Sequence, residues 1–470
     1  MASPFKETVL LDSELKQSTI DLQENLVRTI HSFFPELGDW MYSVPDPRQQ
    51  HKIIYDLPIL LWLGILLFFF KLEATRNLNY VIGYHSDSNF LDNFKRLFPI
   101  LGIKQEELDR IPDYGTLIHL FKKLNPESLE ELQVKSIKNS IRNRTLEKHR
   151  LLGEYYTVAV DGSRIVTFKE QHCKQCLRKK IGIDPESGKI IYEYYHYIVS
   201  LCLVSPQGLC LPILTEFSEN VDIDPDIEKQ DCELKAFYRL APRLKKHFPN
   251  TKFCLLLDSL FENQQVMTIC EKYRWKYIVV FKKSIPLLNK EFEAQKAMYP
   301  EKSITFPLEG NTYRESFFSN DLEHEGHRLS AIDSTVYAQG PEPKKIKYRR
   351  FFTNIFITQK NYREIIKGGA TRWKIENEGF NTLKHGGYQL EHLYAHNYTA
   401  MKVFCHILLI GFSISQFSKL LIGKKIITKK FGSLKIFYQK IRIVFTERFV
   451  PLDLVNTIKF QKYQARLRFT

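Results

Sequence analysis

Three acidic residues occupy positions where a carboxylate is more than ordinary surface charge. Asp161 and Asp258 each follow an apolar run typical of a β-strand, and Glu376 falls with Arg372 on the apolar face of a helix expected over 371–384. Converging carboxylates repel one another unless cations neutralise them, and hard oxygen ligands suit Mg²⁺ or Mn²⁺. Two such ions support in-line phosphodiester chemistry, one activating the attacking hydroxyl and the other stabilising the leaving oxygen.

The expected helix gives its two glutamates different environments. At 100° per residue, Glu376 points inward beside Arg372, whereas Glu378 lies on the opposite polar side with Lys374 and Asn381. This pattern predicts that Glu376 is the functional residue. A buried Arg372–Glu376 pair that only fixes packing is the alternative.

The elements that would position these acids follow an α/β order. The run 253–257 is apolar without alternation, as in a central parallel strand buried on both faces. We expect the first and fourth strands to lie side by side and to bring Asp161 and Asp258 together. The expected elements from 155 to 281 are strands at 155–160, 192–204, 209–217, 253–257 and 277–281, with helices at 232–247 and 263–273.

The length of 470 residues predicts several domains. The apolar run 57–70 is too short for a bilayer and indicates a buried helix. We expect an all-helical N-terminal domain (1–150), the first part of a catalytic core (151–282), a β-rich insertion (283–350), the second part of the core with the Glu376 helix (351–415) and a basic C-terminal segment (416–470).

Charge points to a polyanionic partner. The chain carries 68 Lys and Arg against 53 Asp and Glu, a net charge of +15. From position 416 onward there are 13 basic and 2 acidic residues, so that 13 minus 2, or +11, lies in the last segment. Its interleaved aromatic residues suit a nucleic-acid surface, and a solvated basic surface is the alternative.

The eight cysteines lack the regular spacing of a disulfide scaffold and fit a reducing cytosol. Cys173 and Cys176 form a Cys-x2-Cys pair that could hold a structural zinc with His172, His196, Cys202 or a remote ligand. Because a second closely spaced ligand pair is missing, the sequence favours free thiols.

Three short segments resemble the signatures of DDE transposases of bacterial insertion sequences. They are 159–163 (Ala-Val-Asp-Gly-Ser), 256–260 (Leu-Leu-Asp-Ser-Leu) and 372–377 (Arg-Trp-Lys-Ile-Glu-Asn). The branch with a β-rich insertion has a pattern Tyr-x2-Arg-x3-Glu-x6-Lys around its glutamate. Arg372 and Glu376 keep this spacing, whereas position 369 is Gly and the lysine comes one residue late, at Lys384.

The resemblance implies a ribonuclease H-like mixed sheet with flanking helices. It implies that Asp161, Asp258 and Glu376 bind two Mg²⁺ or Mn²⁺ ions, and that Arg372 and Lys384 contact DNA. The implied partners are the double-stranded DNA of transposon ends and targets, bound by a cytoplasmic, nucleoid-associated homodimer without a membrane. The alternatives are a related nuclease that only cleaves and an inactive, transposase-derived DNA-binding protein.

Overall fold

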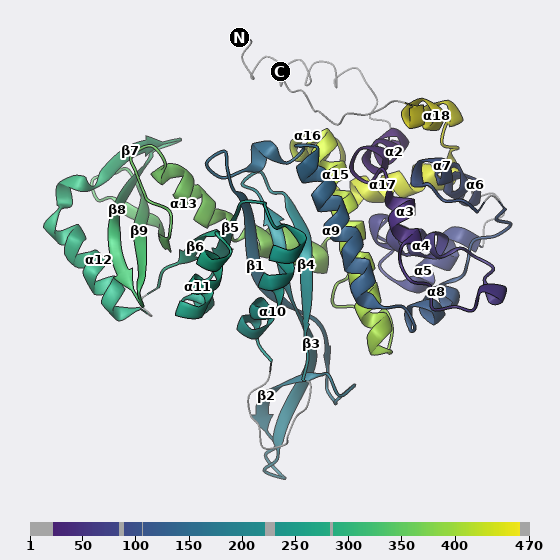
Figure 1. The fold of residues 1–470 in the computed structure, drawn as a ribbon, viewed down its shortest axis with the longest axis horizontal. Helices are drawn as coiled ribbons and strands as arrows, with labels where there is room; N and C mark the ends of the chain where they lie inside the picture. Colours follow the sequence, from purple (N-terminus) through teal and green to yellow (C-terminus); the bar gives the residue numbers. More distant parts are fainter. Residues whose placement is uncertain (1–21, 84–88, 106, 221–230, 283–284, 461–470) are drawn as a thin grey trace. The chain divides into compact units, whose positions relative to one another are not determined.

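The computed structural model of the chain describes residues 22–83, 89–105, 107–220, 231–282 and 285–460. The chain divides into two compact units (Figure 1). The helical unit comprises Met1–Leu146 and Asn381–Thr470, and the sheet unit comprises Glu147–Phe380. Helices combined with a ten-stranded mixed sheet confirm the α/β class expected from the sequence.

Within its described residues, the helical unit contains helices and no strand. The residues before Leu22, where an expected helix over 10–34 would begin, lie outside the described part of the chain. The helices of this unit are α2 (Leu22–Phe33), α3 (Leu37–Tyr42), α4 (Leu57–Phe69), α5 (Thr75–Gly83), α6 (Phe90–Arg96), α7 (Phe98–Leu101), α8 (Tyr114–Phe121), α9 (Pro126–Arg142), α14 (Asn381–His385), α15 (Tyr398–Ile422), α16 (Lys424–Phe431), α17 (Leu434–Glu447) and α18 (Leu452–Phe460).

Helices α4 and α15 form the centre of the helical unit. Every residue of α4 is buried, as expected for the apolar run 57–70, and α15 packs against α2, α4 and α9. The two helices approach closely at glycines, because a Cβ on Gly411 would lie 3.0 Å from the Cβ of Phe68. Among the described residues, α15 is the helix that has the length and apolar composition to cross a membrane. Of its most apolar 18-residue stretch, 83% is buried inside the protein.

The segment 351–415, expected to complete the catalytic core, is divided between the two units. Residues up to Phe380 belong to the sheet unit, and those from Asn381 onward belong to the helical unit. Helix α15 is apolar around its whole circumference, so it needs neighbours on every side. The helices of the N-terminal part supply these neighbours.

The sheet unit is built around strand β1, which pairs with β3 on one side and β5 on the other. The parallel β1–β5 pair confirms that the first and fourth expected strands are neighbours. Strand β6 is parallel to β5, whereas β3 is antiparallel to both β1 and β4. The strands concerned are β1 (Tyr156–Phe168), β3 (Ile190–Val204), β4 (Cys210–Ser218), β5 (Phe253–Leu257) and β6 (Lys276–Val280).

The insertion extends this same sheet instead of forming a separate layer. It opens with a helix, α12 (Pro286–Met298), that the sequence did not predict. The sheet order then continues β6-β10-β9-β8-β7, because β10 pairs antiparallel with β6. The added strands are β7 (Ile304–Leu308), β8 (Thr312–His324), β9 (His327–Ala338) and β10 (Lys344–Thr353).

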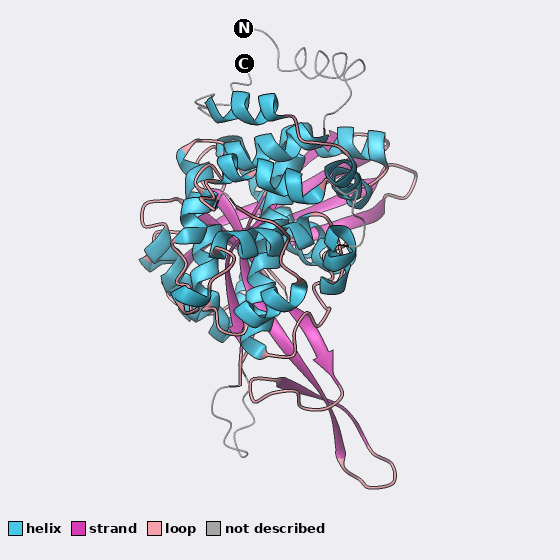
Figure 2. Cartoon of the chain, turned by 90° about the vertical axis from the view of Figure 1, so that its right-hand side faces the viewer, coloured by secondary structure: helices cyan, strands magenta, loops and turns pink. Residues whose placement is uncertain are grey.

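Strand β2 (Leu177–Ile183) pairs with the first residues of β3 and forms a long hairpin that projects from the sheet (Figure 2). Strand β1 accompanies β3 only as far as Tyr194, opposite Phe168. Beyond that point the hairpin is a two-stranded ribbon. We call the whole hairpin, residues 177–195, the arm.

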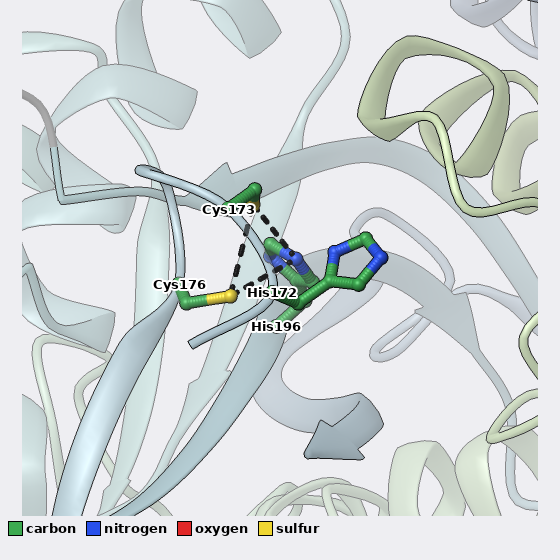
Figure 3. A group of neighbouring side chains, drawn as sticks. All are labelled: His172, Cys173, Cys176 and His196. Carbon is green, nitrogen blue, oxygen red and sulfur yellow. Dashed lines mark hydrogen bonds between the residues drawn. The ribbon is translucent and has the colours of Figure 1, made fainter. Parts of the chain in front are cut away.

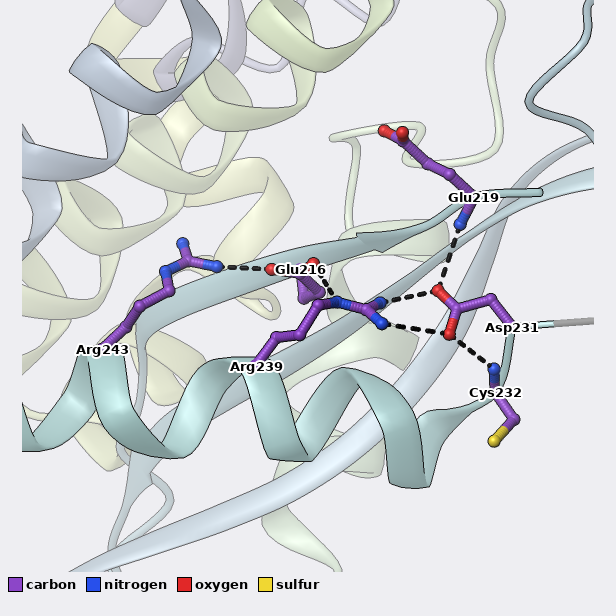
Figure 4. A network of polar contacts seen from close by, with 6 residues as sticks. All are labelled: Glu216, Glu219, Asp231, Cys232, Arg239 and Arg243. Atoms are coloured by element: carbon purple, nitrogen blue, oxygen red, sulfur yellow. Dashed lines mark hydrogen bonds and ion pairs between the residues drawn. The ribbon is translucent and has the colours of Figure 1, made fainter. Parts of the chain in front are cut away.

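Helix α10 (Glu233–His247) connects β4 to β5, and α11 (Gln264–Lys272) connects β5 to β6. Helix α13 (Tyr362–Thr371) follows β10 and packs on β5 and β6. An ionic network fixes α10 to β4 (Figure 4). Arg239 donates to Glu216 at 2.6 Å and to Asp231 at 2.6 Å, and Arg243 also pairs with Glu216. Cys232 holds the N-cap position of this helix, and the carboxylate of the preceding Asp231 pairs with Arg239.

Candidate active site

Asp161 and Asp258 lie where the parallel β1–β5 ladder ends. The last paired residues are Ala159 and Leu256, and each aspartate follows two positions later. Strand β1 does not stop at Asp161 as expected, but continues to Phe168, because its antiparallel ladder with β3 is longer than its ladder with β5. Both aspartates therefore lie at the same edge of the parallel strands.

Each aspartate is oriented by a backbone donor. The Asp258 carboxylate accepts a hydrogen bond from the Leu260 amide at 2.8 Å and caps the short helix η3 (Ser259–Phe261). The Asp161 carboxylate accepts one from the Gly162 amide at 3.0 Å. Each carboxylate keeps a second oxygen for a further partner.

Arg372 joins Asp161 and Glu376. Its Nη2 lies 2.5 Å from Glu376 Oε1 and its Nη1 lies 3.9 Å from Asp161 Oδ2. The Arg372 side chain is only 8% exposed, whereas that of Glu376 is 45% exposed. The structure thus links Glu376 to the partly buried Asp161 through Arg372, and Glu376 stays accessible from solvent.

The segment 371–384 is not one regular α-helix. Helix α13 ends at Thr371, a π-helix η5 covers Ile375–Phe380, and α14 begins at Asn381. A π-helix has more residues per turn than an α-helix. The rotation of 100° per residue expected from the sequence therefore places the side chains of this segment on the wrong faces.

The expected exposure of the two glutamates is therefore reversed. The Glu378 side chain is 17% exposed and pairs with Lys374 at 3.4 Å. It also lies beside the β3–β4 turn, 3.4 Å from where a Cβ on Gly208 would stand. Glu378 is therefore not the residue on an exposed polar face that a regular α-helix would have made it.

Burial and the neighbouring carboxylates of the cluster raise the pKa of Asp161. The pKa of Asp161 is raised to about 7, chiefly by burial; the Arg372 guanidinium opposes this rise, and the charges of Glu376 and Glu233 add to it. One guanidinium does not neutralise this many carboxylates. Oxygen ligands that are partly exposed and short of positive charge fit Mg²⁺ or Mn²⁺.

Glu233 is a fourth carboxylate of the site that the sequence analysis did not identify. It opens α10 and accepts a hydrogen bond from the Tyr197 hydroxyl. Burial raises the pKa of Glu233; the Tyr197 hydrogen bond opposes this shift, and the nearby Asp258 charge adds to it. Only the packing of α10 on the sheet reveals this position.

The glycines next to the acids have steric roles. A Cβ on Gly162 would lie 2.3 Å from the Tyr197 hydroxyl, so glycine after Asp161 leaves room for the phenol. A Cβ on Gly369 would lie 2.7 Å from the Phe351 ring. This close packing of α13 leaves no room for a larger side chain at position 369.

Lys384 belongs to the helical unit, in α14, and its Nζ pairs with Glu391 at 2.8 Å. In the sheet unit, a cavity of about 530 Å³ adjoins Trp373, the residue after Arg372. The Arg349 guanidinium lies 5.6 Å from the Trp373 ring. The cavity is lined by cations and aromatic rings, among them Lys282, Arg349, Arg350, Phe281, Tyr348 and Trp373.

No protein-family model matches the chain, and no curated protein matches its sequence.

Proposed function

We propose that the chain is a DDE-type DNA transposase that cleaves phosphodiester bonds at transposon ends and transfers the strand to target DNA. The observation that carries this proposal is the meeting of Asp161 and Glu376 on Arg372, with Asp258 at the end of the adjacent strand. Acids that are held together by a single guanidinium could bind two metal ions, as two-metal phosphoryl transfer needs.

The strand order supports a ribonuclease H-like core. Strands β4, β3 and β1 are antiparallel neighbours, and β5 and β6 follow β1 in parallel. This is the order that the resemblance to DDE transposases implies, with Asp161 just beyond the parallel part of β1, Asp258 after β5 and Glu376 on a later helical segment.

Asp161, Asp258 and Glu376 would hold two Mg²⁺ or Mn²⁺ ions. When bound, these ions lower the pKa of an attacking water or 3′-hydroxyl and stabilise the oxygen that leaves phosphorus. Arg372 keeps the Asp161 and Glu376 carboxylates aimed at one space. Cleavage adds water across the P–O bond and frees a 3′-hydroxyl. In strand transfer this hydroxyl attacks a target phosphodiester, the new P–O bond replaces the old one, and the 3′-hydroxyl of the target strand leaves.

DNA would be held by cations outside the acid cluster. The cavity beside Trp373 combines guanidinium groups with aromatic rings, which suits a phosphate and a stacked base. In this proposal Arg372 and Lys384 also act near the DNA phosphates, and the active species is a cytoplasmic, nucleoid-associated homodimer on double-stranded DNA.

The test uses DNA that flanks the reading frame, where short inverted repeats are expected. We expect wild-type protein to nick these duplexes with Mg²⁺, and Asp161→Asn, Asp258→Asn and Glu376→Gln each to reduce cleavage at least about 100-fold while DNA binding persists. Asp321→Asn, a change at an exposed carboxylate of the insertion, is the matched control.

Two outcomes would separate the proposal from its alternatives. Cleavage without strand transfer into a target plasmid would favour a nuclease that only cuts, and DNA binding without any cleavage would favour an inactive derivative. Full activity of Glu376→Gln would contradict the assignment of the three acids.

A further inference from the structure

A second cluster of metal-ligating side chains lies at the base of the arm, in the loop between β1 and β2. Cys173 and Cys176 come from this loop and His196 from β3, while His172 precedes the first cysteine (Figure 3). Ligand atoms of all four residues lie within 4.8 Å of one another. We propose that these four residues form a structural zinc site that fixes the arm to the sheet.

The interatomic distances match a tetrahedral zinc site. Cys173 Sγ and Cys176 Sγ are 3.7 Å apart, and they lie 3.3 Å and 3.5 Å from His196 Nε2. With Zn–S of about 2.3 Å and Zn–N of about 2.0 Å, the edges of the tetrahedron are about 3.8 Å between sulfurs and about 3.5 Å between sulfur and nitrogen. Three of the four positions therefore already have the spacing of bound ligands.

The sulfur separation also excludes a disulfide, since bonded sulfurs are about 2.05 Å apart. The loop itself is well ordered by hydrogen bonds. The Cys176 amide donates to the Cys173 carbonyl at 3.3 Å, closing the turn of the Cys-x2-Cys pair, and the Asn220 side chain donates to the Cys176 carbonyl at 2.9 Å. This turn directs both thiols toward His196.

His172 supplies the fourth ligand. Its ring stacks on Phe168, the last residue of β1, with ring centroids 4.3 Å apart. This stacking holds the imidazole near the two sulfurs, with its ligand atom within 4.8 Å of those of the other three residues. The sequence shows no second closely spaced pair of ligands. The two further ligands are His172 and His196, and His196 follows Cys176 by 20 residues.

Zinc at this position has a mechanical consequence for the arm. A two-stranded ribbon is at best marginally stable by itself. The cluster lies where β1 ends and the ribbon begins, so the metal would join the loop before β2 to β3 at the root of the arm. The arm carries cationic and exposed apolar side chains, among them Lys179, Lys180, Ile181, Ile183, Ile190 and Ile191.

The first experiment measures metal in the full chain purified without a histidine tag. We expect about one zinc per chain after dialysis, and less than about 0.1 in Cys173→Ser/Cys176→Ser and in His196→Ala. Cys232→Ser is the matched control, because Cys232 is an exposed thiol on α10. Asp161→Asn should also keep its zinc, so loss of the proposed catalytic site and loss of the zinc site are distinguishable.

A second measurement keeps the test decisive if a variant fails to fold. Wild-type protein stripped of metal under reducing conditions is titrated with Co²⁺, which should give the visible bands of a tetrahedral ion and a thiolate charge-transfer band. Hydrogen exchange should then slow in residues 177–195 upon zinc addition, by about tenfold or more. Absent zinc in the purified wild type together with no cobalt spectrum would overturn the proposal, as would full zinc in the double cysteine variant.

His172 is tested separately. His172→Ala should keep zinc but bind it about 10–100-fold more weakly, because water would replace one of four ligands. An unchanged affinity for zinc in His172→Ala would show that His172 is not a ligand and that the site has three protein ligands.

Discussion

At the scale of single residues, the candidate active site has more carboxylates than cations, and they surround the buried guanidinium of Arg372. Arg372 contacts both Asp161 and Glu376, and Glu233 lies close enough to influence Asp161. Because Asp161 is partly buried and one guanidinium faces several carboxylates, Asp161 is expected to take up a proton more readily than a free carboxylate. The imbalance gives a pH dependence that can be measured without any DNA substrate.

In metal-free protein, the folded state holds the Asp161 proton up to about pH 7, whereas the unfolded chain releases it near 3.8. Between these values the folded state binds more protons, so its stability falls as pH rises. We expect Asp161 to remove about 2–4 kcal/mol from the free energy of unfolding between pH 4 and pH 8. Urea unfolding in chelator at a series of pH values measures this loss.

The comparison with Asp161→Asn isolates the contribution of this one group. The variant should lack that part of the pH dependence and be more stable than wild type at pH 8 without metal. Mg²⁺ should stabilise wild type at pH 8 and stabilise the variant much less. Parallel stability curves for the two proteins would show that Asp161 does not titrate as its burial implies.

At the scale of elements, the π-helix η5 decides which glutamate faces which environment. Its wider turn leaves Glu376 half-exposed beside Arg372 and packs Glu378 beside Lys374 and the Gly208 turn. Such irregular turns within helices occur frequently at functional sites. The two glutamates therefore have separate roles, one in the acid cluster and one in packing.

We expect Glu378→Ala to lower the free energy of unfolding by about 1–2 kcal/mol, because it removes a partly buried ion pair and its packing. Its affinity for Mn²⁺, measured by calorimetry, should change less than about threefold. Glu376→Ala should show the opposite pattern, with a small effect on stability and a large loss of Mn²⁺ affinity. If Glu378→Ala abolished Mn²⁺ binding, Glu378 would be the ligand instead of Glu376.

At the scale of the whole molecule, the basic C-terminal segment is not a separate tail. Its first residues, from Gln416, lie buried in α15, and its aromatic residues Phe437, Tyr438 and Phe445 are buried in the helical unit. The Phe445 ring packs against Phe70 and Phe90. The aromatic residues thus anchor α17, and truncation at Gln416 would remove part of the core.

The exposed lysines of α16 and α17 allow a cleaner test of phosphate binding. We expect replacement of Lys425, Lys429, Lys430 and Lys440 by Gln to leave folding intact, because all four side chains are exposed. The slope of log K against log salt for duplex DNA should decrease by up to about 0.9 per lost phosphate contact. Replacement of two exposed lysines of the insertion, Lys344 and Lys345, by Gln serves as the comparison.

An unchanged salt slope, with wild-type unfolding temperature, would show that this surface does not bind phosphates. A slope that changes only in the Lys344 and Lys345 variant would place the DNA contact on β10 instead.

The sequence by itself determined the alternation of strands and helices, the buried helix α4 and the position of Asp258 directly after a strand. These features depend on local hydrophobic patterning, which a short window of residues contains in full. The adjacency of β1 and β5 also followed, because parallel strands in an α/β order restrict the topologies available. In contrast, the end of a strand expected at Asp161 was wrong, because β1 continues to Phe168.

Only the tertiary structure decided which side chains meet across long separations in the chain. Glu233 joins the acids because α10 is fixed to β4 through Arg239, and His196 meets Cys173 because β3 pairs with both β1 and β2. The exposure of Glu378 was predicted wrongly, because a single π-turn alters the register that a regular helix assumes. Local periodicity carries no information about these contacts, since packing between elements fixes them.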